Sequence, residues 1–271
     1  MATANTPYPG LTFLKLGGSL VTDKTREATP RPDILQRLAA EVQAARDVRP
    51  EQKLLIGHGS GSFGHFAARR HGTRERVRTA KEWTGYAQVS RSAARLNRLV
   101  ADTFSDAGIP ILSLQPSASA RCQDGELQSL ALAAIHAALR VGLIPLLYGD
   151  VALDNVRGGT IISTEEIFRF LTPVLRPDRI LLIGEAPGVL DAAGDTIDAI
   201  RPCQLDSIAA QLGASHGVDV TGGMLGKVTA MLELIATCPS LSVRILSGLP
   251  AGEVQRALVD PSYSTGTLLA A

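Results

Sequence analysis

Short apolar runs alternate with longer amphipathic segments along this chain, and this alternation constrains its fold more than any other feature. The runs have the length of strands and are almost continuously apolar, as in a parallel sheet covered on both faces. The expected strands are Leu11–Leu16, Lys53–Gly57, Ile109–Leu114, Leu143–Tyr148, Arg179–Ile183 and Val243–Ser247. Strands separated by helices predict a three-layer αβα sandwich with a mainly parallel central sheet and right-handed crossovers.

The segments between these runs carry helix signals. Pro32 suits a first helical position, and Ser163 with Glu166 three residues later is typical of a capping box. The expected helices are Pro32–Arg46, Lys81–Ala107, Ser129–Val141, Thr164–Leu175, Gln204–Leu212 and Met224–Thr237. Val151–Asp154 and Gly159–Ser163 predict a β-hairpin inserted into the alternation.

Size and composition favour one domain over residues 1–271. A 28.5 kDa chain buries roughly 70–75% of its unfolded surface, which is enough for a core without metals or disulfides. The chain has no low-complexity tract or composition break that would mark a linker. If there are two lobes, we expect them to share one sheet, with a boundary near Leu175–Asp178.

Charge and cysteine content exclude several classes of protein. The 27 basic and 26 acidic residues leave a net charge of +1, so nothing attracts the whole chain to nucleic acid or to an anionic membrane. Cys122, Cys203 and Cys238 lack metal-ligand spacing and are expected to be free thiols in a reducing cytoplasm. Met1–Gly10 does not have the pattern of a signal peptide, and charged residues and a proline interrupt the apolar stretch Leu130–Tyr148. We therefore expect a soluble cytoplasmic protein.

Three glycine-rich segments follow expected strands or open expected helices. In the first, Lys15–Ser19, the adjacent Gly17 and Gly18 allow backbone N–H groups to approach a phosphate, with Lys15 beside them. A turn that ends a strand explains this segment equally well when it is taken alone. Lys24 joins the same site only if its loop folds back.

The second segment, His58–His65, places Gly59, Ser60 and Gly61 between a strand and a helix. Backbone amides and the positive end of a helix converge there into an anion site. A ring N–H of His65 could donate to a phosphate oxygen, whereas His58 is expected to be structural.

The third segment, Thr221–Lys227, opens a helix and places Lys227 one turn inside it, within reach of a phosphate. A capped amphipathic helix with a surface lysine is an equally good reading of this segment alone. Together, however, the three junctions would meet at the C-terminal edge of an open α/β sheet. Two anion sites with lysines between them indicate phosphoryl transfer.

With these segments, the chain resembles the amino acid kinase superfamily, and within it the isopentenyl phosphate kinases. The resemblance covers nearly the whole chain and is most specific at Ser62–His65. It rests on Lys15–Ser19, Asp23–Lys24, His58–His65, Gln115–Ser117, Gly149–Asp150, Ile162–Ser163 and Asp219–Met224 with Lys227. It implies ATP-dependent phosphorylation of isopentenyl phosphate to isopentenyl diphosphate, by a homodimer whose Mg²⁺ is held mainly by the ATP phosphates and not by a protein metal site.

The resemblance also implies a role for each motif residue. Lys15, Lys24 and His65 would be catalytic, with Lys24 stabilising the phosphoryl group in transfer. The residues expected to bind ATP are Lys15, Gly17, Gly18, Ser19, Gly61, Glu185, Gly188, Gly223 and Lys227. The residues expected to bind the acceptor are Gly59, Ser60, His65, Tyr86, Val89, Gly149, Asp150, Ser163 and Thr164. The acceptor lobe would span about 1–176 and the nucleotide lobe about 177–271.

Three departures from the family pattern bear on these roles. Thr164-Glu165-Glu166 stands where Gly-Asp-Asp is common, although the longer carboxylates could still orient Lys15 or Lys227. Gly184-Glu185-Ala186-Pro187-Gly188 replaces a usual Asp-x-Asp-Gly, and Ser60 replaces a common glycine. Alternatives are a fosfomycin-kinase-like enzyme acting on another phosphate or phosphonate, a uridylate kinase, and a nucleotide-binding regulator without catalysis.

Overall fold

The main sheet runs through the middle of the molecule. The computed structural model describes residues 7–205, 208 and 220–271, and within them this sheet has eight strands in the order β10-β12-β11-β9-β1-β2-β6-β3. Its strands are β1 (Thr12–Leu16), β2 (Leu54–His58), β3 (Ile111–Ser113), β6 (Ile144–Tyr148), β9 (Arg179–Gly184), β10 (Ala199–Ile200), β11 (Ser242–Ser247) and β12 (Thr267–Leu269). All neighbouring strands run parallel except β11 and β12.

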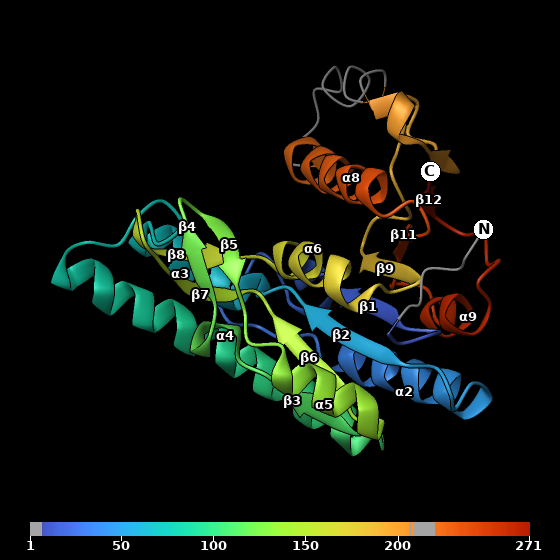
Figure 1. The fold of residues 1–271 in the computed structure, drawn as a ribbon, viewed down its shortest axis with the longest axis horizontal. Helices are drawn as coiled ribbons and strands as arrows, with labels where there is room; N and C mark the ends of the chain where they lie inside the picture. The colour runs from blue at the N-terminus through green and yellow to red at the C-terminus, as the bar shows by residue number, and fades with distance from the viewer. Residues whose placement is uncertain (1–6, 206–207, 209–219) are drawn as a thin grey trace.

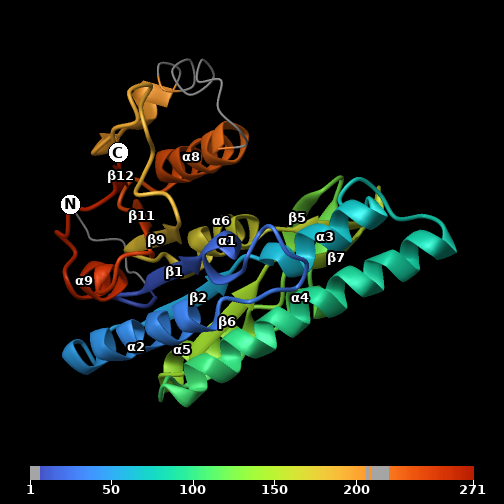
Figure 2. The ribbon, with the colours of Figure 1, turned by 180° about the vertical axis from the view of Figure 1, so that it is seen from behind.

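Helices cover both faces of this sheet (Figures 1 and 2). One face carries α1 (Gly18–Val21), α2 (Pro32–Val48), α4 (Ala80–Asp106) and α9 (Glu253–Val259). The other face carries α5 (Ala133–Val141), α6 (Thr164–Leu175) and α8 (Val220–Thr237). Helix α3 (Gly61–His71) follows β2 and lies along α4, and two short 3₁₀ helices span Pro116–Ala118 and Pro202–Gln204. The predicted three-layer α/β architecture is confirmed.

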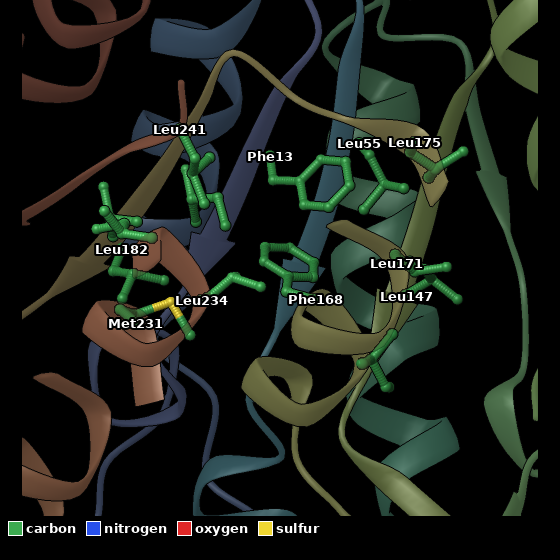
Figure 3. Close-up of a cluster of buried hydrophobic side chains, with 14 of the residues drawn as sticks. Phe13, Leu55, Leu147, Phe168, Leu171, Leu175, Leu182, Met231, Leu234 and Leu241 are labelled. Carbon is green, nitrogen blue, oxygen red and sulfur yellow. The ribbon is translucent and has the colours of Figure 1, made fainter. Parts of the chain in front are cut away.

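Two apolar clusters hold the layers together, one on each face of the sheet. In the larger cluster, Phe13 from β1 packs on Phe168 from α6 with ring centroids 4.9 Å apart (Figure 3). Met231 and Leu234 of α8 join the same cluster. Side chains of β1 thus lie in the middle of the core, as expected for a central strand covered on both faces.

A second sheet is only partly anticipated by the sequence. The predicted hairpin is present as β7 (Asp150–Asp154) and β8 (Gly158–Ile162), but it belongs to a four-stranded sheet completed by β4 (Arg121–Gln123) and β5 (Glu126–Ser129). The prediction of helix from Ser129 is therefore wrong, because Ser129 pairs with Arg121 and the helix begins at Ala133.

The helix that the third glycine segment opens also differs from its predicted bounds, Met224–Thr237. Helix α8 already includes Gly222 and Gly223, so Lys227 lies about two turns from Val220. The expected helix Gln204–Leu212 falls largely outside the described residues. No described helix is both long and apolar enough to cross a membrane.

Candidate active site

The first two predicted phosphate-binding segments meet at one edge of the main sheet. Leu16 at the end of β1 is paired with His58 at the end of β2 and with Ile183 near the end of β9. His58 is in turn paired with Tyr148, the last residue of β6. Because these strands end in register, the loops after them leave the sheet side by side, where ligands bind in open α/β sheets.

The first two glycine segments pack backbone against backbone. A Cβ on Gly18 would lie 2.5 Å from the amide nitrogen of Gly61, and one on Gly59 would lie 2.8 Å from the nitrogen of Gly18. Gly61 also has a φ of +48°, a conformation that favours glycine. Thr22 joins the two segments, since its hydroxyl donates to the Gly18 carbonyl at 2.6 Å and accepts from the Ser62 amide at 2.9 Å.

Lys15 near the end of β1 forms an ion pair with Glu165 of α6. Its Nζ lies 2.8 Å from Oε1 of Glu165, and both side chains are largely buried. Burial would raise the pKa of Glu165, but the positive charges of Lys15 and Lys227 bring it below its ordinary value. Glu165 is therefore ionised, and the longer carboxylate at this departure from the family pattern does orient Lys15.

Lys227 and Lys24 approach the same ion pair. Burial, followed by the charges of Lys15 and Lys24, lowers the pKa of Lys227, while the charge of Glu165 opposes this shift. The loop that carries Lys24 folds back over the second glycine segment, where the amide of Thr29 donates to the Ser62 hydroxyl. Three lysines and one carboxylate thus form a cluster with net positive charge, suited to an oligophosphate.

The two histidines of the second segment have different surroundings. His58 is completely buried, stacks on Tyr148, and approaches Asn97 through Nε2 at 3.3 Å. Burial lowers its pKa, so its predicted structural role is supported. His65 is exposed in the early part of α3, the helix that opens immediately after Ser60. Ser60 fits there because residue 64 is glycine, where a Cβ would lie 2.2 Å from the Ser60 Oγ.

The remaining predicted acceptor residues lie around the ends of β6 and β8. The amide of Gly149 donates to the His58 carbonyl, and Ser163 caps α6 in the predicted capping box with Glu166. The Thr164 hydroxyl donates to the His58 carbonyl at 2.6 Å, so it anchors α6 to β2. Burial raises the pKa of Asp150, against hydrogen bonds from Ser117 and Val151.

A small apolar cluster lies beside these residues. Ala67 of α3, Val89 of α4 and Val151 of β7 are buried together, with Tyr86 and Ile161 packed against them. A Cβ on Gly159 would lie 2.9 Å from the Tyr86 ring. Burial, and next the charge of Asp150, raise the pKa of Tyr86 to about 12. The cluster therefore adjoins the polar acceptor residues, as an alkyl-binding wall would.

The predicted nucleotide residues beyond β9 are less closely gathered. Glu185 forms an ion pair with Arg31 at 2.7 Å. Gly188 is buried where a Cβ would lie 2.6 Å from both Thr196 and Thr267, so this glycine is explained by packing. Gly223 is exposed, with open space around its Cα.

Sequence reasoning missed two contributors to the site. Thr22 had no motif to mark it, although a small polar residue just after a glycine-rich turn is well placed to accept an amide. Arg31 pairs with Glu185 across 154 positions of the sequence, and no local pattern reports such a contact.

Comparisons with known proteins agree with this geometry. The model of the amino acid kinase family matches residues 10–247. The isopentenyl phosphate kinase of Haloferax volcanii is 38% identical over 90% of this chain and 96% of its own, and that of Methanocaldococcus jannaschii is 33% identical over 80% and 85%. A crystal structure described as isopentenyl phosphate kinase superposes with a TM-score of 0.81 at 27% identity, covering 96% of this chain and 100% of that one. The chain thus belongs to the amino acid kinase family, on the branch of the isopentenyl phosphate kinases.

Proposed function

We propose that this protein transfers the γ-phosphoryl group of ATP to isopentenyl phosphate, giving isopentenyl diphosphate and ADP. The observation that carries this proposal is the adjacency of two unlike surfaces at one sheet edge. One is the cation cluster of Lys15, Lys24 and Lys227 with its glycine segments. The other is the apolar cluster around Val89. A phosphate acceptor with a short alkyl tail matches both surfaces.

The residues of the site divide the work of phosphoryl transfer. Lys15, oriented by Glu165, and the amides of Gly17–Ser19 and Gly61 would hold the ATP phosphates, with Lys227 on the nucleotide side. His65 and the amides of Gly59 and Ser60 would hold the acceptor phosphate. Lys24 would neutralise charge on the phosphoryl group between them. Positioning and charge neutralisation supply most of the catalysis in such reactions.

The reaction needs no general base on the protein. An anionic oxygen of the acceptor phosphate attacks the γ-phosphorus, a new P–O bond forms, and the bond to the β-phosphate oxygen breaks with its electron pair leaving on ADP. No proton has to be removed from the attacking oxygen. This fits a site in which the Glu165 carboxylate is already paired with Lys15.

We place Mg²⁺ on the ATP phosphates. Among the described residues, no group of three or more histidine, cysteine or acidic side chains could hold a metal ion. The ion would neutralise phosphate charge as part of the nucleotide complex.

A coupled assay of ADP release separates the candidate functions. Isopentenyl phosphate, fosfomycin and UMP are offered in turn as acceptors with MgATP. We expect rapid ADP release only when the acceptor is isopentenyl phosphate. Turnover only with fosfomycin would show that the protein is a fosfomycin kinase, and turnover only with UMP that it is a uridylate kinase. ATP binding without turnover of any acceptor would indicate a regulator, although the ordered Lys15–Glu165 pair favours catalysis.

A homodimer is the assembly that we expect, by likeness to the family. Exposed apolar residues such as Leu99 on α4 and Val48 on α2 are available for contact. Light scattering on the purified protein measures the mass directly, and a monomer at micromolar concentration would contradict this expectation.

A further inference from the structure

Two buried polar atoms lie near the end of α3 without a protein partner. Neither Nε2 of His71 nor Oγ1 of Thr73 makes a hydrogen bond to any residue that the structure describes. Both atoms are buried, and the whole of Thr73 has 0% exposure. Such groups are rare in folded proteins, because a buried hydroxyl or ring nitrogen loses its hydration and gains nothing in return.

The residues that carry these atoms neighbour the small apolar cluster of Ala67, Val89 and Val151. Ala67 belongs to that cluster, and His71 follows it by one turn on the same face of α3. The His71 ring lies against Gly85 of α4, where a Cβ would be 2.5 Å from its Cγ. Gly85 precedes Val89 of the cluster by one turn. Helices α3 and α4 run side by side here (Figure 2), so His71 continues the wall that Ala67 and Val89 begin.

Thr73 approaches the same place from the loop after α3. The carbonyl of the next residue, Arg74, accepts a hydrogen bond from the Thr160 hydroxyl of β8 at 3.1 Å. The neighbouring Gly159 contacts the Tyr86 ring. The loop that holds Thr73 is therefore fastened to the strand against which Tyr86 packs.

His71 is the last residue of α3, and His65 lies near the start of the same helix. His71 follows His65 by six positions on α3, which is about 9 Å along a helix axis. An all-carbon tail that reached this point would leave the polar atoms of His71 and Thr73 without partners.

We propose that His71 and Thr73 form a polar subsite that accepts a hydroxyl group at the far end of a short alkyl monophosphate. A hydroxyl can donate to one of the two atoms and accept from the other, since the Thr73 hydroxyl can do either and the tautomer of His71 sets the role of Nε2. The substrate class of the site thereby includes ω-hydroxylated five-carbon monophosphates. This inference rests on the proposed function, because it takes the acceptor phosphate to lie at His65.

The test compares two acceptors that differ only in that hydroxyl. 3-Methylbutyl phosphate and 4-hydroxy-3-methylbutyl phosphate are assayed for kcat/KM with MgATP, and their Kd values are measured by calorimetry without nucleotide. In the unaltered protein we expect the hydroxylated acceptor to bind at least as tightly as its parent. Thr73→Val should lower the ratio of hydroxylated to parent kcat/KM about tenfold, the size expected when a buried polar group loses its partner.

Control variants keep the result interpretable. Thr84→Val removes a hydroxyl that is exposed on α4 and bonded to the Ala80 carbonyl, and it should leave the ratio within about twofold. His71→Leu provides a second route if Thr73→Val does not fold, as judged by thermal melting. It should lower the same ratio.

The outcomes separate this inference from the proposed function. If isopentenyl phosphate is phosphorylated but the ratio does not respond to Thr73→Val or His71→Leu, the polar subsite is wrong and the function stands. If isopentenyl phosphate gives no ADP while calorimetry still shows a hydroxyl preference that Thr73→Val abolishes, the subsite stands and the function is wrong.

Discussion

Glu165 illustrates how one carboxylate can organise a cationic site. It is buried, ionised and in contact with Lys15, and its pKa responds to Lys227 as well. Without it, the charges of Lys15 and Lys227 would repel each other with no carboxylate between them. The charge of Lys15 is one of the causes that lower the pKa of Lys227, and the charge of Glu165 opposes it. The carboxylate therefore offsets the repulsion between the two lysines, and we propose that the phosphates of ATP do the same when they bind.

We expect Glu165→Gln to lower kcat for isopentenyl phosphate by at least tenfold and to destabilise the fold by about 3 kcal/mol, because it leaves Lys15 buried without its counter-charge. Glu165→Asp keeps the charge with a shorter reach and should restore much of the rate. The measurements are steady-state kinetics and urea unfolding of both variants. Equal losses in the two variants would show that side-chain length, not charge, is what the site requires.

Removal of the His65 side chain should affect one substrate only. We expect His65→Ala to lower kcat/KM for the acceptor by ten- to a hundredfold, since a hydrogen bond to a charged group contributes about 1.5–3 kcal/mol. The Kd for ATP should change little, because we place His65 on the acceptor side. Calorimetry with ATP and kinetics with isopentenyl phosphate measure the two effects. If His65→Ala kept the kcat/KM of the unaltered protein, His65 would not bind the acceptor phosphate.

Lys227 should make nucleotide binding sensitive to alkaline pH. Its pKa is lowered, chiefly by burial and then by Lys15, so it loses its charge at a lower pH than an ordinary lysine. Attraction for ATP should therefore weaken as the pH rises through that lowered pKa. Lys227→Arg stays charged throughout and should hold its affinity. Titrations from about pH 7 to about pH 10 compare the two proteins, and parallel curves would contradict the assignment.

At the scale of elements, the sequence predicted helices and strands correctly where the signal is local. Helix α6 has its predicted bounds, Thr164–Leu175, because the capping box marks its start. Strands β4 and β5 were missed because they are short and largely exposed, without the apolar run that marks a buried strand. The contact between Lys15 and Glu165 joins residues 150 positions apart in sequence, so the sequence left open which glutamate is used and whether it orients Lys15 or Lys227.

We expect helix α4 to set the length of the proposed acceptor pocket through Tyr86. The ring lies between Gly159 and the edge of Trp83. Tyr86→Ala should lengthen the pocket and raise kcat/KM for geranyl phosphate relative to isopentenyl phosphate. Each added methylene that finds apolar contact contributes about 0.8 kcal/mol, so five further carbons can change the ratio by orders of magnitude. Tyr86→Phe is the matched control, because it keeps the ring and should leave the ratio unchanged. An unchanged ratio in Tyr86→Ala would place the tyrosine in the core only.

At the scale of the whole molecule, the two proposed lobes share the centre of one sheet. Strand β1, from the lobe of about 1–176, is paired with β9, from the lobe of about 177–271, over five residues from Thr12 to Leu16. The larger core cluster likewise combines Phe168 with Met231 and Leu182. Neither lobe can open along this line without exposing paired strand edges and apolar side chains to water. We therefore propose that the lobes are a functional division of one cooperative fold.

We accordingly expect a single unfolding transition for the full chain, with calorimetric and van't Hoff enthalpies that agree. ADP should raise the midpoint of the whole transition, because a ligand that binds only the folded state stabilises everything that unfolds with its site. A fragment of residues 1–176 should stay unfolded, since β1 would become an edge strand with its apolar face uncovered. Differential scanning calorimetry and circular dichroism make these measurements. Two transitions, of which ADP moves only one, would show instead that the nucleotide lobe folds on its own.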